Sequence, residues 1–128
     1  ASGEITVGLV NHYYMHRYQA EHGGGAPIAN HYFPAGGPGA LLNVAGAGVL
    51  STSQRKETAT QFIAFLLSTE AQQYFAGETD EYPLAGENIQ TNPSVKPLSE
   101  IAVPDIDLSN LNDLQGTLEL LQRAGVLN

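Results

Sequence analysis

An apolar run near the start of the chain, Ile5-Thr6-Val7-Gly8-Leu9-Val10, most constrains the fold, because it ends abruptly at Asn11-His12-Tyr13-Tyr14. A continuous β-branched and aliphatic run of this length is typical of a strand buried on both faces. Residues 12–21 contain no Gly or Pro, and Asn11 stands where a helix N-cap is expected. The sequence therefore predicts a strand followed by a helix, with two tyrosines at their junction. In open α/β sheets, ligands bind at this end of a strand.

Tyr13 and Tyr14 are candidate ligands for a hard metal ion. Deprotonated phenols offer hard oxygen donors, which highly charged cations prefer, whereas imidazole and thiolate suit softer metals. The backbone N–H groups at the start of the helix can hold an anion beside the metal. The two rings can equally form an aromatic pair that packs at the edge of a sheet. The dipeptide alone does not decide between these uses.

Further apolar stretches predict more strands and helices. Residues 28–33 and 41–50 are expected to be strands, separated by a Gly- and Pro-rich loop at 34–39. Helical spacing and capping residues predict a helix that follows Ser53, a shorter one that begins at a Thr69/Gln72 capping box, and a C-terminal one that stops at Gly125. The expected fold class is α/β, a mixed sheet flanked by helices.

Charge and composition restrict the classes of partner. The chain has 13 acidic and 5 basic residues, and binding to nucleic acid or to anionic membranes needs clustered Lys and Arg. No stretch approaches a membrane span and no signal peptide opens the chain, so export would rest on a segment already removed. All four histidines and four of the six tyrosines lie within residues 12–32. Any chemistry is therefore expected in the N-terminal quarter.

The residues also leave two other functions to consider, a zinc site and an enzyme. His12 and His16 have the i, i+4 spacing that can hold zinc. The intervening Glu of a zinc protease is missing, because Tyr13 occupies its position. Solvated helix histidines and a hydrogen-bonded His31 are the favoured interpretation. With no Cys and no Gly-x-Ser-x-Gly motif, the chain is not expected to be an enzyme.

Longer segments of the chain resemble a known family, the bacterial ferric-ion-binding periplasmic receptors of iron ABC transporters (type 2 periplasmic binding proteins). The matching segments follow one another in order, at residues 8–14, 31–40, 43–50, 65–68, 74–76, 81–84, 104–108 and 116–121. The motif Asn-His-Tyr-Tyr at residues 11–14 is fairly specific to the iron-binding branch. The resemblance covers only the C-terminal portion of these two-lobed receptors, which are much longer than this chain.

The resemblance implies a function and a site. Tyr13 and Tyr14 would bind Fe3+ as phenolates, and Asn11 would help to hold a synergistic anion, carbonate or phosphate. The receptor would be periplasmic or at the cell surface and would deliver iron to an ABC-transporter permease. In this family the first lobe supplies further iron ligands, so the chain alone is expected to bind iron far more weakly. A related reading keeps the fold but changes the ligand to a sugar, polyamine or other small solute, because fold does not fix function.

The resemblance also implies a division of the chain between two lobes. Residues 1–43 and 93–128 would belong to one lobe, and residues 44–92 to the other. Pieces of two lobes would leave strand edges and apolar helix faces uncovered, and such edges pair with other chains. We therefore expect a complex with the missing N-terminal lobe segment or a homo-oligomer, to which domain swapping is one route.

Overall fold

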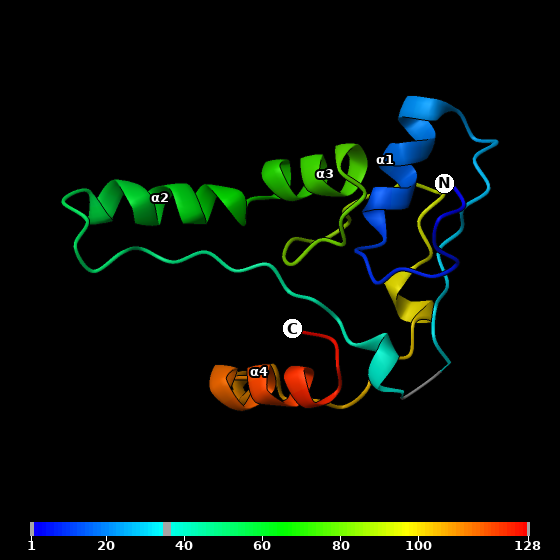
Figure 1. Cartoon of the computed structure of the whole chain (residues 1–128). Coiled ribbons are helices and arrows are strands. Elements are labelled where there is room, and N and C mark those ends of the chain that lie inside the picture. Colours follow the sequence, from blue (N-terminus) through cyan, green and yellow to red (C-terminus); the bar gives the residue numbers. More distant parts are fainter. Residues whose placement is uncertain (1, 35–36, 128) are drawn as a thin grey trace.

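The computed structural model describes residues 2–34 and 37–127. Within these residues the regular structure consists of α-helices and short 3-10 helices (Figure 1). The α-helices are α1 (Tyr13–His22), α2 (Lys56–Leu66), α3 (Thr69–Glu78) and α4 (Leu114–Arg123). The 3-10 helices are η1 (Pro38–Ala40), η2 (Leu98–Glu100) and η3 (Leu108–Asn110).

The four α-helices confirm the helices that the sequence predicts, but not all of the predicted capping residues. Ser68, rather than Thr69, caps α3, because its side chain accepts a 3.3 Å hydrogen bond from the backbone N–H of Ala71. The chain turns away after α4 at Gly125, which has a φ of +70°. That left-handed conformation favours glycine, as the sequence indicated.

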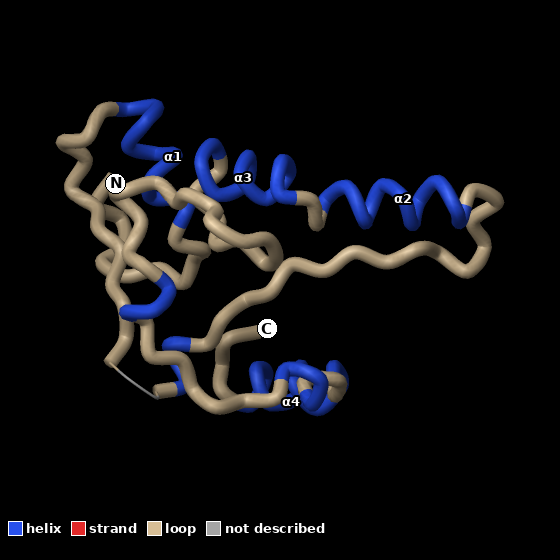
Figure 2. The backbone as a smooth tube through the Cα atoms, turned by 180° about the vertical axis from the view of Figure 1, so that it is seen from behind, coloured by secondary structure: helices blue, strands red, loops and turns tan. Residues whose placement is uncertain are grey.

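The predicted fold class is wrong for the part of the chain that the structure describes. Residues 5–10, 28–33 and 41–50 were expected to be strands of a mixed sheet flanked by helices. Figure 2 shows helices and loops, and none of the described residues is in a strand. Of the predicted loop at 34–39, residues 35 and 36 lie outside the described residues, and η1 begins within its last part.

The exposure of the apolar run 5–10 explains this difference. Val7 is 81% exposed and Leu9 is 90% exposed, so neither is buried as a central strand residue would be. A strand exists only when neighbouring strands satisfy its backbone N–H and C=O groups and cover its faces. No described segment of this chain pairs with the run. The composition of the run is therefore that of a buried strand, but the described residues of this chain do not provide the neighbouring strands that would bury it.

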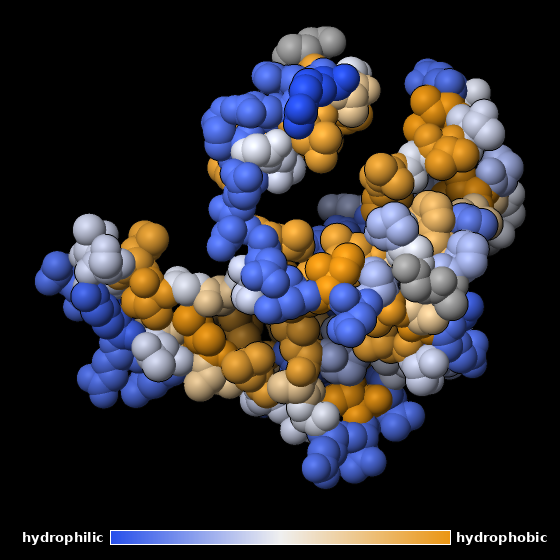
Figure 3. Space-filling model, turned by 90° about the horizontal axis from the view of Figure 1, so that it is seen from below, coloured by the Kyte–Doolittle hydropathy of each residue, from blue (hydrophilic) through white to orange (hydrophobic). Residues whose placement is uncertain are grey.

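The helices are spread out, with little shared core. Among the described helices only α2 and α3 contact each other, and they lie end to end as one arm of the molecule (Figure 1). Both views place α4 apart from the other helices. The buried apolar side chains are small: Ala40, Ala71, Ala76 and Val95. Figure 3 accordingly shows hydrophobic residues distributed over the visible surface of the molecule.

One buried glutamine fixes the loop that follows α3. Gln72 is 3% exposed, and its side-chain N–H donates to the carbonyl of Leu66 at 2.8 Å. Its side-chain oxygen accepts from the backbone N–H groups of Leu84 at 2.7 Å and Ala85 at 3.3 Å. These bonds fold the loop back onto α3, from where the loop reaches the beginning of α1.

None of the described helices is both long and apolar enough to cross a membrane.

Candidate functional site

The two adjacent tyrosines begin helix α1 and lie against each other. Their ring centroids are 4.7 Å apart and the planes are inclined by 51°. Tyr14 is half-exposed, while Tyr13 is partly buried. The pair therefore occupies the mouth of a helix, as the sequence predicted, and at least the ring of Tyr14 can be reached from solvent.

Asn11 contacts Tyr13 directly. The amide Nδ2 of Asn11 donates a 2.8 Å hydrogen bond to the phenol oxygen of Tyr13. The Oδ1 of Asn11 lies 3.5 Å from the Nδ2 of Asn43, which approaches from a different part of the chain. The structure thus brings the three predicted site residues together: Asn11 is hydrogen-bonded to Tyr13, and the ring of Tyr13 lies against that of Tyr14.

The prediction that Asn11 caps α1 is wrong. His12 is the N-cap residue, and no side-chain hydrogen bond caps the helix there. Asn11 contributes its backbone carbonyl instead, which accepts from the N–H of Tyr14 at 3.3 Å. Its Oδ1, the atom that would accept a capping hydrogen bond, lies 3.5 Å from the Nδ2 of Asn43 instead. The first turn of α1 also contains no acidic residue.

His12 anchors the start of α1 to a distant loop. Its Nε2 lies 2.7 Å from the carbonyl oxygen of Asp80 and must carry the proton, because a carbonyl can only accept. The imidazole ring also lies against Tyr82, with centroids 4.7 Å apart. On the other side, Asn30 donates to the carbonyl of His12 at 2.9 Å. This role of His12 could not be predicted from the sequence, because Asp80, Tyr82 and Asn30 are far from it along the chain.

The histidine pair does not have the surroundings of a zinc site. His16 is 9% exposed, which contradicts the expectation that both helix histidines are solvated. The ring centroids of His12 and His16 are 6.5 Å apart. Within residues 2–34 and 37–127, no group of three or more His, Cys, Asp or Glu side chains could hold a metal ion.

Tyr82 packs behind His12 and remains protonated. Burial is the main cause that raises the pKa of its phenol to about 12, and the neighbouring phenol of Tyr32 and the hydrogen bond between the two phenols add to it. The phenol of Tyr82 donates a 2.5 Å hydrogen bond to the carbonyl of Lys96. Tyr82 is therefore a structural support for the start of α1 and differs in this from the exposed Tyr14.

This arrangement suits a hard cation together with an anion. A pair of contacting tyrosine rings and a side-chain amide bonded to one of the phenols lie at the N-terminus of a helix whose first turn contains no acidic residue. The helix N-terminus favours negative charge through its free N–H groups and its dipole. Phenolate oxygens are hard ligands.

Comparison with known proteins identifies the family. A model of the family described as bacterial extracellular solute-binding protein matches residues 1–73. The chain is 32% identical, over 98% of its length, to the major ferric iron-binding protein of Neisseria meningitidis serogroup A, and covers 38% of that protein. It is 28% identical to the Fe(3+)-binding periplasmic protein of Serratia marcescens, covering 98% of the chain and 37% of the relative. It is 36% identical to iron uptake protein A1 of Synechocystis sp., covering 98% of the chain and 36% of that relative.

These relatives confirm the resemblance to ferric-ion-binding periplasmic proteins. The chain spans 38% of the length of the first of them. A solute-binding family also agrees with the expectation of a binding protein rather than an enzyme. The matched region includes the Asn-His-Tyr-Tyr segment and all of α1. The chain belongs to the family of bacterial extracellular solute-binding proteins.

Proposed function

We propose that the protein carrying this chain is an extracytoplasmic receptor that binds ferric iron and delivers it to an ABC-transporter permease. The support comes from relatives that are named for ferric iron binding and iron uptake and that match 98% of the chain. One of them is named as periplasmic, which supports the same location for this protein.

The observation that carries the proposal is the contact of Asn11, Tyr13 and Tyr14 at the start of α1. In the proposed complex both phenols bind Fe3+ as phenolates. The hydrogen bond from Asn11 would stabilise the negative charge on the oxygen of Tyr13, because a donor to the charged form favours that form. The partial exposure of Tyr14 leaves its oxygen free to meet an ion that arrives from solvent.

The same end of the helix is the proposed place of a synergistic anion, carbonate or phosphate. Asn11 uses one of its two amide N–H bonds on Tyr13, so the second can be directed to an anion. The N–H groups of the first turn of α1 supply further donors. An anion here would occupy positions on the metal that the two phenolates leave open.

We propose that the remaining iron ligands come from a part of the receptor outside this chain, which covers 38% of the length of the first relative. In this scheme residues 1–43 and 93–128 belong to one lobe and residues 44–92 to the other. The hydrogen bond between His12 and Asp80 joins a residue of each group, so the tyrosine pair lies beside the meeting point of the two proposed lobes. Such a location between lobes is a common place for a ligand site.

Proton release follows from this chemistry. A free tyrosine phenol has a pKa of about 10, so ionising one at pH 7 costs about 4 kcal/mol. Ferric ion supplies the compensating stabilisation, and binding of deprotonated ligands makes affinity depend on pH. We expect the full-length receptor to release about two protons to the medium on binding Fe3+ at pH 7. The receptor should release iron as the medium is acidified.

The test uses conservative tyrosine variants of the full-length protein. Tyr13→Phe and Tyr14→Phe keep the ring packing and remove only the donor oxygens. Each should reduce the visible phenolate-to-iron absorption and weaken Fe3+ binding by more than the roughly 10–100-fold that loss of a hydrogen-bond partner of a metal ligand costs. Tyr74→Phe is the matched control, because Tyr74 is 58% exposed and lies on α3. Retention of colour and affinity in both site variants would show that this pair does not bind iron.

A further inference from the structure

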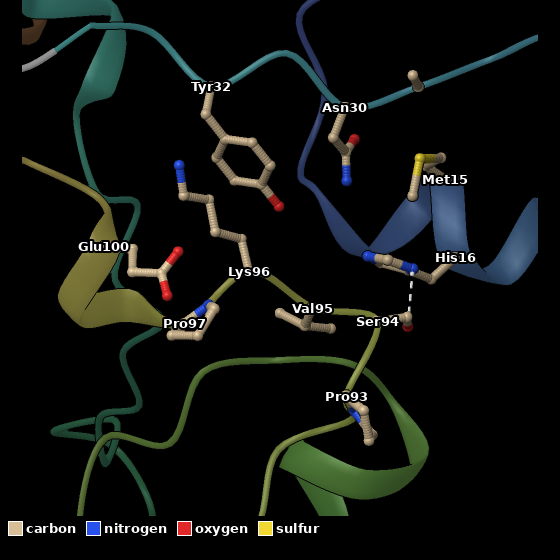
Figure 4. A pocket seen from close by; sticks show the side chains of 11 residues that line it. Met15, His16, Asn30, Tyr32, Pro93, Ser94, Val95, Lys96, Pro97 and Glu100 are labelled. Carbon is tan, nitrogen blue, oxygen red and sulfur yellow. Dashed lines mark hydrogen bonds between the residues drawn. The ribbon is translucent and has the colours of Figure 1, made fainter.

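A second concave site lies beside α1. It has a volume of about 380 Å³ and is formed by α1, residues 29–32 and residues 93–100 (Figure 4). Its walls include His16, Met15, Tyr32, Val95, Lys96 and Glu100. Asn11, Tyr13 and Tyr14 do not line it. The chemistry of this pocket can be derived from the hydrogen bonds around it.

A chain of hydrogen bonds fixes the proton on His16. The carboxylate of Asp80 accepts from the Nδ2 of Asn92 at 2.8 Å, and this sets the orientation of that amide. The Oδ1 of Asn92 then accepts from the hydroxyl of Ser94 at 2.8 Å. Since the single hydroxyl proton of Ser94 is used in that bond, its oxygen can only accept from the Nδ1 of His16, at 3.5 Å. His16 therefore carries its proton on Nδ1 when it is neutral.

The other nitrogen of His16 is consequently an acceptor without a donor. Nε2 is buried and has no hydrogen-bond partner among the residues that the structure describes. Figure 4 shows it directed away from Ser94, toward the space between Asn30 and Val95. Met15, which also lines the pocket, has an unbranched and adaptable side chain that can move to admit a ligand. A buried acceptor of this kind lacks stabilisation that a ligand donor could restore.

A cation and a carboxylate stand at the opposite end of the pocket. The Nζ of Lys96 lies 5.3 Å from the centre of the Tyr32 ring, in a cation–π contact. Basic residues are few in this chain, which has 5 Lys and Arg and a net charge of −8, and Lys96 places one of them at the pocket. Glu100 lies on the same side as Lys96 in Figure 4. The apolar Val95 lies between the two ends, and Met15 lies at the His16 end (Figure 4).

We propose that this pocket binds a small carboxylate that also carries a hydroxyl or ammonium group and an aliphatic side chain. The ligand's carboxylate accepts from Lys96, its hydroxyl or ammonium group donates to Nε2 of His16, and its aliphatic part packs on Val95 and Met15. Hydroxy acids and amino acids share this chemistry.

The test compares three ligands of one shape on the full chain. L-leucine carries an ammonium donor, L-2-hydroxy-4-methylpentanoate carries a hydroxyl donor, and 4-methylpentanoate carries neither. We expect at least one of the first two to bind and to shift the 15N resonance of His16 Nε2. We expect 4-methylpentanoate to bind at least about tenfold more weakly than that ligand, which is the effect of one hydrogen bond to an otherwise unpaired buried group. Without ligand, the 15N shifts of His16 should show a proton on Nδ1.

Variants at the charged end complete the test. Lys96→Met should weaken binding at least about tenfold, as expected for loss of a hydrogen bond to a charged group, whereas Lys56→Met at the start of α2 should leave it unchanged. If none of the three ligands shifts His16, or if 4-methylpentanoate binds as tightly as the other two, the proposal is wrong. An equal loss in Lys56→Met and Lys96→Met would contradict it as well.

Discussion

The imidazole Nε2 of His12 donates a 2.7 Å hydrogen bond to the carbonyl oxygen of Asp80, a residue 68 positions further along the chain. Asp80 has a φ of +59°, a left-handed conformation that is uncommon for residues other than glycine, and its carboxylate is held by Asn92. His12 immediately precedes the tyrosine pair. The bond therefore links the position of the candidate iron ligands to the conformation of a distant, strained loop.

Replacing His12 should loosen this link. His12→Phe keeps a ring against Tyr82 but removes the hydrogen bond, and we expect it to lower the free energy of unfolding by about 1–2 kcal/mol. His12→Gln retains an N–H donor and should recover part of that loss. Denaturant unfolding of the three proteins measures the effect. His22→Phe is the control, because His22 is exposed at the end of α1. An equal effect of His12→Phe and His22→Phe would show that the bond to Asp80 does not stabilise the chain.

Two neighbouring glutamines on α3 provide a matched comparison of burial. Gln73 bridges α3 to the following loop through both side-chain atoms, whereas Gln72 binds that loop through its oxygen and the carbonyl of Leu66 at the end of α2 through its N–H. Gln72 is 3% exposed, whereas the bonds of Gln73 with Gln90 are open to solvent. Gln72→Leu leaves buried backbone groups without partners and should cost about 2–3 kcal/mol. Gln73→Leu should cost less than about 1 kcal/mol, because water can replace its bonds.

Urea unfolding of both leucine variants measures this difference. Amide hydrogen exchange adds a local reading, since the N–H groups of Leu84 and Ala85 should lose protection in Gln72→Leu and keep it in Gln73→Leu. Equal destabilisation by the two substitutions would mean that burial of Gln72 is not the reason for its contribution.

The helices were predictable from the sequence because their signals are local. Spacing of apolar residues, a capping residue and a terminal glycine act within a few positions, as the end of α4 at Gly125 shows. The strands were not predictable in the same way. The run 5–10 has the composition of a buried strand, but a strand depends on neighbours, and the described residues provide none.

The candidate site was also predicted only in part. Tyr13, Tyr14 and Asn11 are close in the sequence, so their contact follows from a helix that begins between them. The contributions of His12 and His16 depend on partners at Asp80 and Ser94, far along the chain. A local pattern carries no information about such partners. For that reason the i, i+4 spacing of the two histidines suggested a shared metal, although the two side chains have different roles.

Tyr82 predicts a loss of stability at high pH. Its folded pKa of about 12 lies above its ordinary value of 10.0, so between these pH values the unfolded chain has released the proton and the folded chain retains it. The free energy of unfolding should therefore be unaffected below pH 10 and should fall as the pH rises from 10 to 12. The pKa difference corresponds to at most about 2.7 kcal/mol, and partial solvent screening should reduce this to about 1 kcal/mol.

The measurement is the free energy of unfolding of the chain and of its Tyr82→Phe variant across this pH range. The variant cannot ionise at this position, so the difference between the two proteins should shrink by about 1 kcal/mol between pH 10 and pH 12. Tyr74→Phe is the control and should run parallel to the unmodified chain. A constant difference for Tyr82→Phe would show that the phenol of Tyr82 is not shielded in the folded state.

The exposed apolar run predicts association of the 128-residue chain with itself. Val7 and Leu9 are 81% and 90% exposed, and a run rich in β-branched and aliphatic residues can pair with the same run of a second copy. Sedimentation velocity should show a mass that rises with concentration. Val7→Asp with Leu9→Asp should shift the chain toward the monomer, because like charges would then face each other in the paired runs. Val103→Asp, at a site 41% exposed outside the run, should change the mass little. A single compact monomer at every concentration, with melting independent of concentration, would contradict this prediction.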